Sequence, residues 1–139
     1  MRLLKNSAAT LLVLAFTAAP APADVVAVVS VKSAVTALSK NQIIDIFLGK
    51  TRKFPDGTPT VPIDLADGSS ARDEFYLRLD GKTAAQMAAY WSKIIFTGRG
   101  QPPPTVSDPI EMKKRITANP AAIGYIDRSL LDASVRVVF

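Results

Sequence analysis

A short turn followed by a helical pattern holds the residues whose types and spacing fit anion binding. Residues 66–75 read ADGSSARDEF, in which Ser69 and Ser70 supply hydroxyl groups and Arg72 supplies a guanidinium group. The first N–H groups of a helix have no partner within the helix, and they lie at the positive end of the helix dipole. Such a terminus can bind an oxyanion through its backbone. Gly68, Ser69, Ser70 and Arg72 are therefore the candidate oxyanion ligands.

The same residues also fit an ordinary turn and helix cap. Asp-Gly is a common turn sequence, and a serine before a helix often accepts a hydrogen bond from an N–H group of its own first turn. Both interpretations start a helix near Ser70 and end it near Leu79. They differ in whether the polar groups of the turn remain free for a ligand.

Catalytic and metal chemistry have weaker support. The sequence has no histidine and no cysteine, which removes the usual base of a serine hydrolase and two common metal ligands. Asp64, Asp67 and Asp73 lie close to the serines, but their spacing fits no dedicated metal-binding loop. Pairing with Arg72 or capping of a helix explains these carboxylates more simply. We expect a protein that is not an enzyme and that needs no metal or cofactor.

The elements that precede the turn place it at the end of a strand. Asp24–Val31 (DVVAVVSV) is β-branched and almost wholly apolar, which predicts a central strand covered on both faces. Ser39 and Gln42 form a capping-box pattern that starts a helix. Thr60–Leu65 alternates like a second strand, and Pro62 indicates an edge position.

Two more helices and two more strands are expected after the turn. Apolar residues at helical spacing predict which side of each helix faces the core. Thr83 and Gln86 start one helix, and Asp108-Pro109 starts the other. Strands are expected over 121–126 and 135–139. In the helix that follows the turn, the residues expected to face the core or to lie at the edge of the core-facing side are Phe75, Leu77 and Leu79. In the next two helices, the residues expected to face the core are Met87, Tyr90, Trp91, Ile94 and Ile95, and then Ile110, Met112 and Ile116.

This alternation of strands and helices predicts an α/β fold with a mixed sheet flanked by helices in three layers. Ligands of open α/β sheets bind beyond the carboxyl ends of strands. The turn at 67–70 follows such an end, so the predicted fold and the candidate site agree.

The first 23 residues have the pattern of a secretory signal. Arg2 and Lys5 precede an apolar stretch over 8–19, and Ala21-Pro22-Ala23 fits a cleavage site. We expect cleavage after Ala23, a periplasmic location, and a mature chain without a transmembrane segment. Residues 24–139 then form one domain. The net charge of +5 includes the two basic residues of the signal, and the remaining mild excess does not suggest a nucleic-acid partner.

Four motifs in a fixed order resemble the phosphate-binding proteins of bacterial phosphate ABC transporters. They are Ile46–Lys50 (IFLGK), Pro55-Asp56-Gly57, the turn at 67–70, and Ala122–Ile126 (AIGYI). The resemblance extends from Val25 to about Asp127. It implies the type 2 periplasmic-binding-protein fold, phosphate as ligand, an ABC permease as partner, and Ser69 as a ligand serine.

The chain departs from this family in two ways. Leu65 and Ala71 stand where the family carries an arginine and a threonine, and Arg72 is a candidate to supply the lost guanidinium group. The chain also has the length of one lobe, so it cannot enclose an anion alone. We expect roughly millimolar phosphate affinity for the monomer, and a homodimer wherever binding is tight. The alternative is a ligand-free interaction module that uses the basic loop 50–54 or the proline segment 102–104.

Overall fold

The computed structural model describes residue 15 and residues 24–139. Apart from residue 15, the predicted signal peptide lies outside the described residues, and its cleavage after Ala23 stays a prediction. No helix among the described residues is long and apolar enough to cross a membrane.

The centre of the structure is a four-stranded mixed sheet with the strand order β2-β5-β1-β6. β1 (Val25–Ser30) is buried along its whole length and runs antiparallel to both β5 (Ala122–Asp127) and β6 (Val135–Val137). β2 (Val61–Pro62) is parallel to β5 and forms one edge. The central position of the first strand and the edge position of Pro62 are both confirmed.

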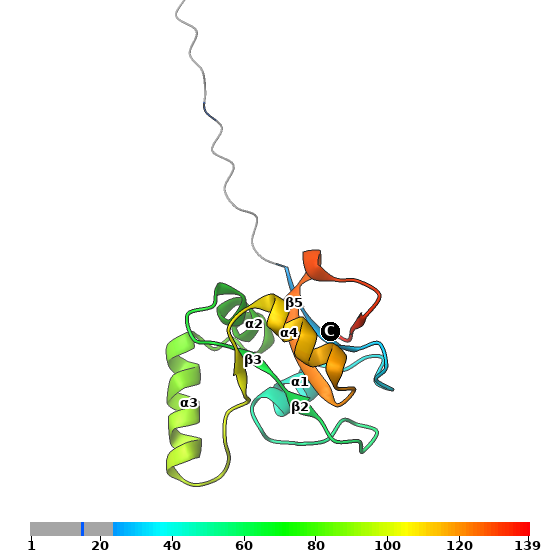
Figure 1. Ribbon diagram of the computed structural model, residues 1–139. Coiled ribbons are helices and arrows are strands. Elements are labelled where there is room, and N and C mark those ends of the chain that lie inside the picture. The colour runs from blue at the N-terminus through cyan, green and yellow to red at the C-terminus, as the bar shows by residue number, and fades with distance from the viewer. Residues whose placement is uncertain (1–14, 16–23) are drawn as a thin grey trace, which may run out of the picture.

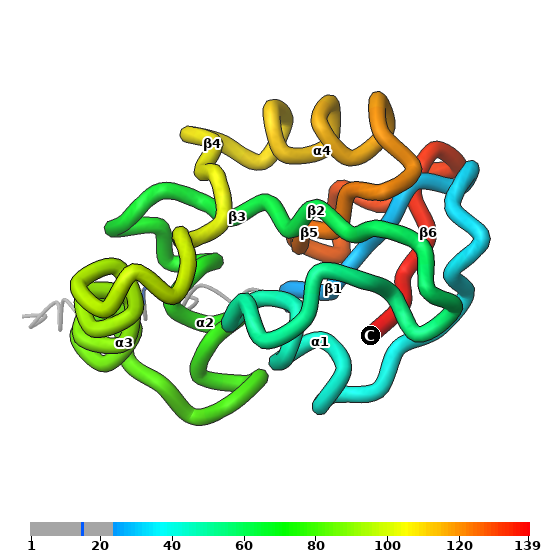
Figure 2. The backbone as a smooth tube through the Cα atoms, turned by 90° about the horizontal axis from the view of Figure 1, so that it is seen from below, coloured from blue at the N-terminus to red at the C-terminus, as the bar shows by residue number. Residues whose placement is uncertain are grey.

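Helices cover both faces of this sheet. α4 (Pro109–Ala118) lies on one face, and α1 (Lys40–Phe47) and α2 (Ser70–Asp80) lie on the other (Figures 1 and 2). α3 (Ala84–Phe96) lies to one side of these layers, on the side where β3 lies (Figure 2). The predicted α/β class with a mixed sheet flanked by helices is therefore confirmed.

The predicted helix starts are also confirmed. Ser39 and Thr83 each form a capping box, in which their side chains accept the N–H groups of Gln42 and Gln86. Asp108 caps α4, where a proline occupies the first turn. These polar side chains satisfy N–H groups that a helix start leaves without partners.

The predicted strand 60–65 divides into two short strands in different sheets. β2 pairs with β5, whereas β3 (Asp64–Leu65) pairs in parallel with β4 (Thr105–Val106) in a separate two-stranded sheet. The change occurs at Ile63, whose N–H donates to Ile123, while the next N–H, that of Asp64, donates to Pro104. The sequence did not predict β4, because it has only two residues and directly follows three prolines.

Three of the residues expected to face the core are exposed instead. Ile110 is 70% exposed, Leu77 51% and Ile95 49%. Ile110 lies in the first turn of α4, whereas Met112 and Ile116, four residues apart, face the sheet. In α2, Tyr76 is buried in place of Leu77.

Candidate anion site

The candidate site lies on the turn that leads from β3 into α2. Gly68 has φ +87°, a conformation that glycine adopts without steric cost. The N–H group of Ser69 donates to the carbonyl of Ala66 at 3.3 Å, which closes the turn. The structure thus holds Gly68, Ser69, Ser70 and Arg72 in one short segment, with Gly68 and Ser70 exposed to solvent.

Ser69 is the N-cap of α2, as the second sequence interpretation predicts. Its Oγ accepts a hydrogen bond from the N–H group of Arg72 at 3.3 Å. A serine hydroxyl that accepts one bond still has a proton to donate. The N–H groups of Ser70 and Ala71 make no hydrogen bond with the residues that the structure describes. The cap therefore uses one donor of this helix start and leaves two backbone donors and two hydroxyl groups for a ligand.

Arg72 is held by two carboxylates of its own chain. Its guanidinium group donates to the carboxylate of Asp67, and its Nε lies 3.7 Å from Oδ2 of Asp64. The guanidinium carbon also lies 5.8 Å from the ring centre of Tyr76, within cation–π range. Burial lowers the pKa of Arg72, but the charges of Asp64 and Asp67 outweigh this effect and raise it. An anion that uses Arg72 must compete with these two carboxylates.

Asp64 is the centre of a buried polar network that anchors the site. Only 1% of Asp64 is exposed, and its carboxylate accepts hydrogen bonds from the Tyr76 hydroxyl at 2.6 Å and from the Tyr125 hydroxyl. The N–H group of Leu65 donates to the same carboxylate at 2.9 Å. Since Tyr76 belongs to α2 and Tyr125 to β5, the network ties the first turns of α2 to the central sheet and to β3.

The pKa values of this network reflect its burial. Burial raises the pKa of Asp64, although hydrogen bonds from Tyr125 and Tyr76 and the charge of Arg72 lower it in part. Burial and the nearby charge of Asp64 raise the pKa values of Tyr76 and Tyr125, so both tyrosines stay protonated and act as donors at neutral pH. The sequence predicts that Asp64 lies near the serines and pairs with Arg72, but it does not predict the contacts with the two tyrosines. A carboxylate inside the apolar segment VPIDL was the available signal.

No group of three or more acidic residues in the described part of the chain is arranged to hold a metal ion. Asp67 instead bonds Arg72, and Asp64 is enclosed by hydrogen-bond donors. Both aspartates therefore have the pairing role that the sequence suggested for them.

Comparisons with known proteins agree on the fold. No protein-family model matches the chain, and no curated protein matches it. A proposed phosphate ABC transporter substrate-binding protein from Clostridium perfringens, solved with bound phosphate, shares 26% identity at a TM-score of 0.64. An ABC-type phosphate transport receptor from Vibrio cholerae gives 18% identity and a TM-score of 0.64. A proposed phosphate-binding protein from Planctomyces limnophilus gives 12% identity and a TM-score of 0.61.

The match covers most of this chain but less than half of each of these structures. It spans 82% of this chain and 43%, 44% and 40% of the three others. This asymmetry agrees with a short chain that supplies one lobe. The resemblance seen in the sequence is confirmed: the chain has the periplasmic-binding-protein fold, and it is similar to one lobe of the phosphate ABC transporter substrate-binding proteins.

Proposed function

We propose that this protein is exported and binds phosphate or a related oxyanion at the turn 67–72, as a solute-binding protein or an accessory to one. The observation that carries the proposal is the free N–H pair of Ser70 and Ala71 beside two serine hydroxyls at the exposed start of α2. The similarity to phosphate-binding proteins supports phosphate as the ligand. A periplasmic location and an ABC permease as partner belong to the same proposal.

The geometry favours an anion bound by neutral donors. Ser70 and Ala71 offer backbone N–H groups, Ser69 and Ser70 offer hydroxyl protons, and Gly68 lets the ligand approach the backbone closely. Arg72 adds positive charge next to these donors, and Asp67 partly cancels it. The role of the chain in this mechanism is binding, without a bond-making step.

The affinity of a single chain should be low, because the site is open to water. Charge-assisted hydrogen bonds in an exposed site supply a few kcal/mol, and about 4 kcal/mol corresponds to a Kd of roughly 1 mM. We propose that micromolar binding would need a second copy of the chain to cover the turn.

Calorimetric titration with phosphate and then sulfate tests the proposal. We expect saturable phosphate binding that Ser69→Ala weakens, because the variant loses a hydroxyl donor of the site. The matched control is Thr83→Ala, which removes the equivalent N-cap hydroxyl of α3. Both variants lose one helix cap, worth about 1 kcal/mol of stability, but only Ser69→Ala should change phosphate binding. Equal binding by the two variants would contradict the assignment of Ser69.

A second candidate function is a ligand-free interaction module of the cell envelope. Phe96, at the end of α3, is 92% exposed and follows the half-exposed Ile95, so this end of the helix offers apolar side chains for a protein contact. Arg72 is also already paired. Stabilisation of the protein against thermal unfolding by millimolar phosphate favours the binding protein, and its absence favours the module.

A further inference from the structure

A cavity of about 490 Å³ lies apart from the anion turn, on the side of the sheet edge formed by β2. Its walls come from the loop after α1, the start of β2, the second half of α3 and the proline segment 102–104. No residue of the turn 66–72 lines it. Its volume is within the range typical of small-molecule sites, about 300–1,000 Å³.

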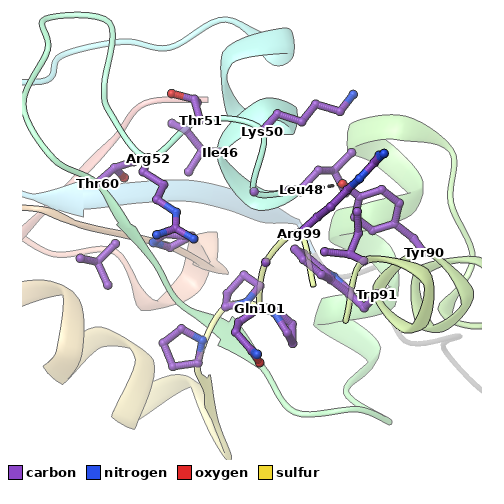
Figure 3. Close-up of a pocket in the computed structure, with 18 residues that line it drawn as sticks. Ile46, Leu48, Lys50, Thr51, Arg52, Thr60, Tyr90, Trp91, Arg99 and Gln101 are labelled. Atoms are coloured by element: carbon purple, nitrogen blue, oxygen red, sulfur yellow. Dashed lines mark hydrogen bonds between the residues drawn. The ribbon is translucent and has the colours of Figure 1, made fainter. Parts of the chain in front are cut away.

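Two buried polar atoms on the cavity wall have no hydrogen-bond partner. Oγ1 of Thr60 and Nε1 of Trp91 are both buried without a partner, and each of these residues is only 6% exposed. Figure 3 shows Thr60 on one side of the cavity and Trp91 on the other. Buried polar groups in folded proteins are nearly always satisfied. Both residues line the cavity, although neither atom is exposed to it, so each side chain must rotate slightly to donate to an acceptor of a guest.

The charge around the cavity is positive. Lys50, Arg52 and Arg99 line it, and none of the three makes an ion pair with the residues that the structure describes. The lining includes no aspartate or glutamate. In Figure 3 the Arg52 side chain extends between Thr60 and Trp91. A guest with a carboxylate would therefore meet an arginine fork, which suits that group in particular.

The rest of the wall is apolar. Ile46 and Pro103 are buried there, and Ile94 is half-buried. The Tyr90 hydroxyl already donates to the carbonyl of Leu48 at 2.7 Å, so this donor is satisfied without a ligand. An apolar ring or short chain fits between these side chains better than a free inorganic ion does.

We propose that this cavity binds a small organic carboxylate with an apolar body. The carboxylate pairs with Arg52 and accepts a hydrogen bond from the Thr60 hydroxyl. A second acceptor at the far end of the guest takes the indole N–H of Trp91. This site is independent of the anion turn.

The test uses 4-hydroxybenzoate, which has a carboxylate and a distal oxygen on a flat ring. The sequence contains one tryptophan, so a nitrogen-15 NMR spectrum of the protein has one indole N–H signal, which reports on Trp91. We expect this signal to shift in a saturable way. 4-Hydroxybenzamide, the neutral counterpart, should bind with at least about tenfold lower affinity. No shift of the indole signal up to about 10 mM, or equal binding of the two compounds, would overturn the proposal.

Two variants separate the pairing with Arg52 from a general effect of charge. Arg52→Gln should weaken 4-hydroxybenzoate binding about tenfold, whereas Lys114→Gln, which removes one exposed charge on α4, should leave it unchanged. Equal losses in both variants would refute the role of Arg52. Ser69→Ala should also bind 4-hydroxybenzoate normally, and phosphate should not move the indole signal. Failure of one site would thus be distinguishable from failure of the other.

Discussion

The buried hydroxyl of Tyr125 is the group whose removal tests the Asp64 network most sharply. Tyr125 is fully buried in β5, and its ring stacks on that of Phe75 with centroids 4.0 Å apart. Tyr125→Phe keeps this ring and removes only the hydroxyl. The variant therefore isolates one hydrogen bond to the Asp64 carboxylate from the surrounding packing.

The expected loss depends on the charge of Asp64. A hydrogen bond to an ionised group contributes about 1.5–3 kcal/mol to stability, and a bond between neutral groups contributes about 1 kcal/mol. The N–H group of Leu65, which also approaches the Tyr125 hydroxyl at 3.1 Å, keeps its 2.9 Å bond to Asp64 in the variant. We expect Tyr125→Phe to lose about 2–3 kcal/mol when Asp64 is ionised.

The pH dependence has a definite sign. Burial raises the pKa of Asp64, so this carboxyl binds its proton more readily in the folded chain than in the unfolded chain. The resulting contribution to stability is present at acid pH and is lost as the pH rises through the raised pKa. Above that pKa the folded protein depends on the tyrosine hydroxyls to stabilise the charge. The cost of Tyr125→Phe should therefore increase with pH.

Urea unfolding from pH 4 to 8 measures this cost. Tyr90→Phe is the matched control, because the Tyr90 hydroxyl donates to a neutral carbonyl, that of Leu48. It should cost about 1 kcal/mol at every pH. A cost for Tyr125→Phe that stays near that of Tyr90→Phe, or that does not change with pH, would refute the charged network.

Three further predictions concern other parts of the molecule. Asp67→Asn should tighten phosphate binding roughly fivefold in calorimetry, because unit charges about 4 Å apart in water repel by about 1 kcal/mol; unchanged affinity would place the anion elsewhere. Gly124→Ala should lose about 1–3 kcal/mol in thermal unfolding, because the added Cβ would lie 2.5 Å from Sδ of Met112; an unaltered melting temperature would show that α4 can move away. Hydrogen bonds, first from Lys113 and then from Ser134, hold the pKa of Asp132 at about 2. The stability that the ionised carboxylate adds to the folded protein is therefore lost as the pH falls from about 4 to 2. In Lys113→Gln an NMR titration should find the pKa of Asp132 nearer its usual value, and an unchanged pKa would contradict this pairing.

Local patterns were sufficient to predict the helices and the central strand. Ser39, Thr83 and Asp108 cap their helices as predicted, because capping depends on residues only three positions apart. The position of Val25–Ser30 inside the sheet was predictable for a similar reason. Its nearly continuous run of apolar residues indicates that both of its faces are covered, whichever elements cover them.

Features that depend on distant partners could not be predicted in this way. Asp64 meets Tyr125 across 61 positions of the sequence, and the apolar residues around Asp64 indicate that its carboxylate needs a partner but not which residue supplies it. The split at Ile63 likewise depends on β4, which forms only when the chain returns at Thr105. The turn itself was predictable as a cap and as a candidate site, and so was the pairing of its aspartates with Arg72, but the hydrogen bonds from Tyr76 and Tyr125 to Asp64 needed the fold.

A nitrogen-15 NMR titration of the backbone amides with phosphate tests most directly whether this turn binds an anion. We expect the Ser70 and Ala71 signals to shift in a saturable way. Ala84 and Ala85, the equivalent first residues of α3 behind the Thr83 cap, provide the internal control and should stay fixed. Unmoved signals at Ser70 and Ala71, or equal shifts at both helix starts, would contradict a specific anion site on this turn.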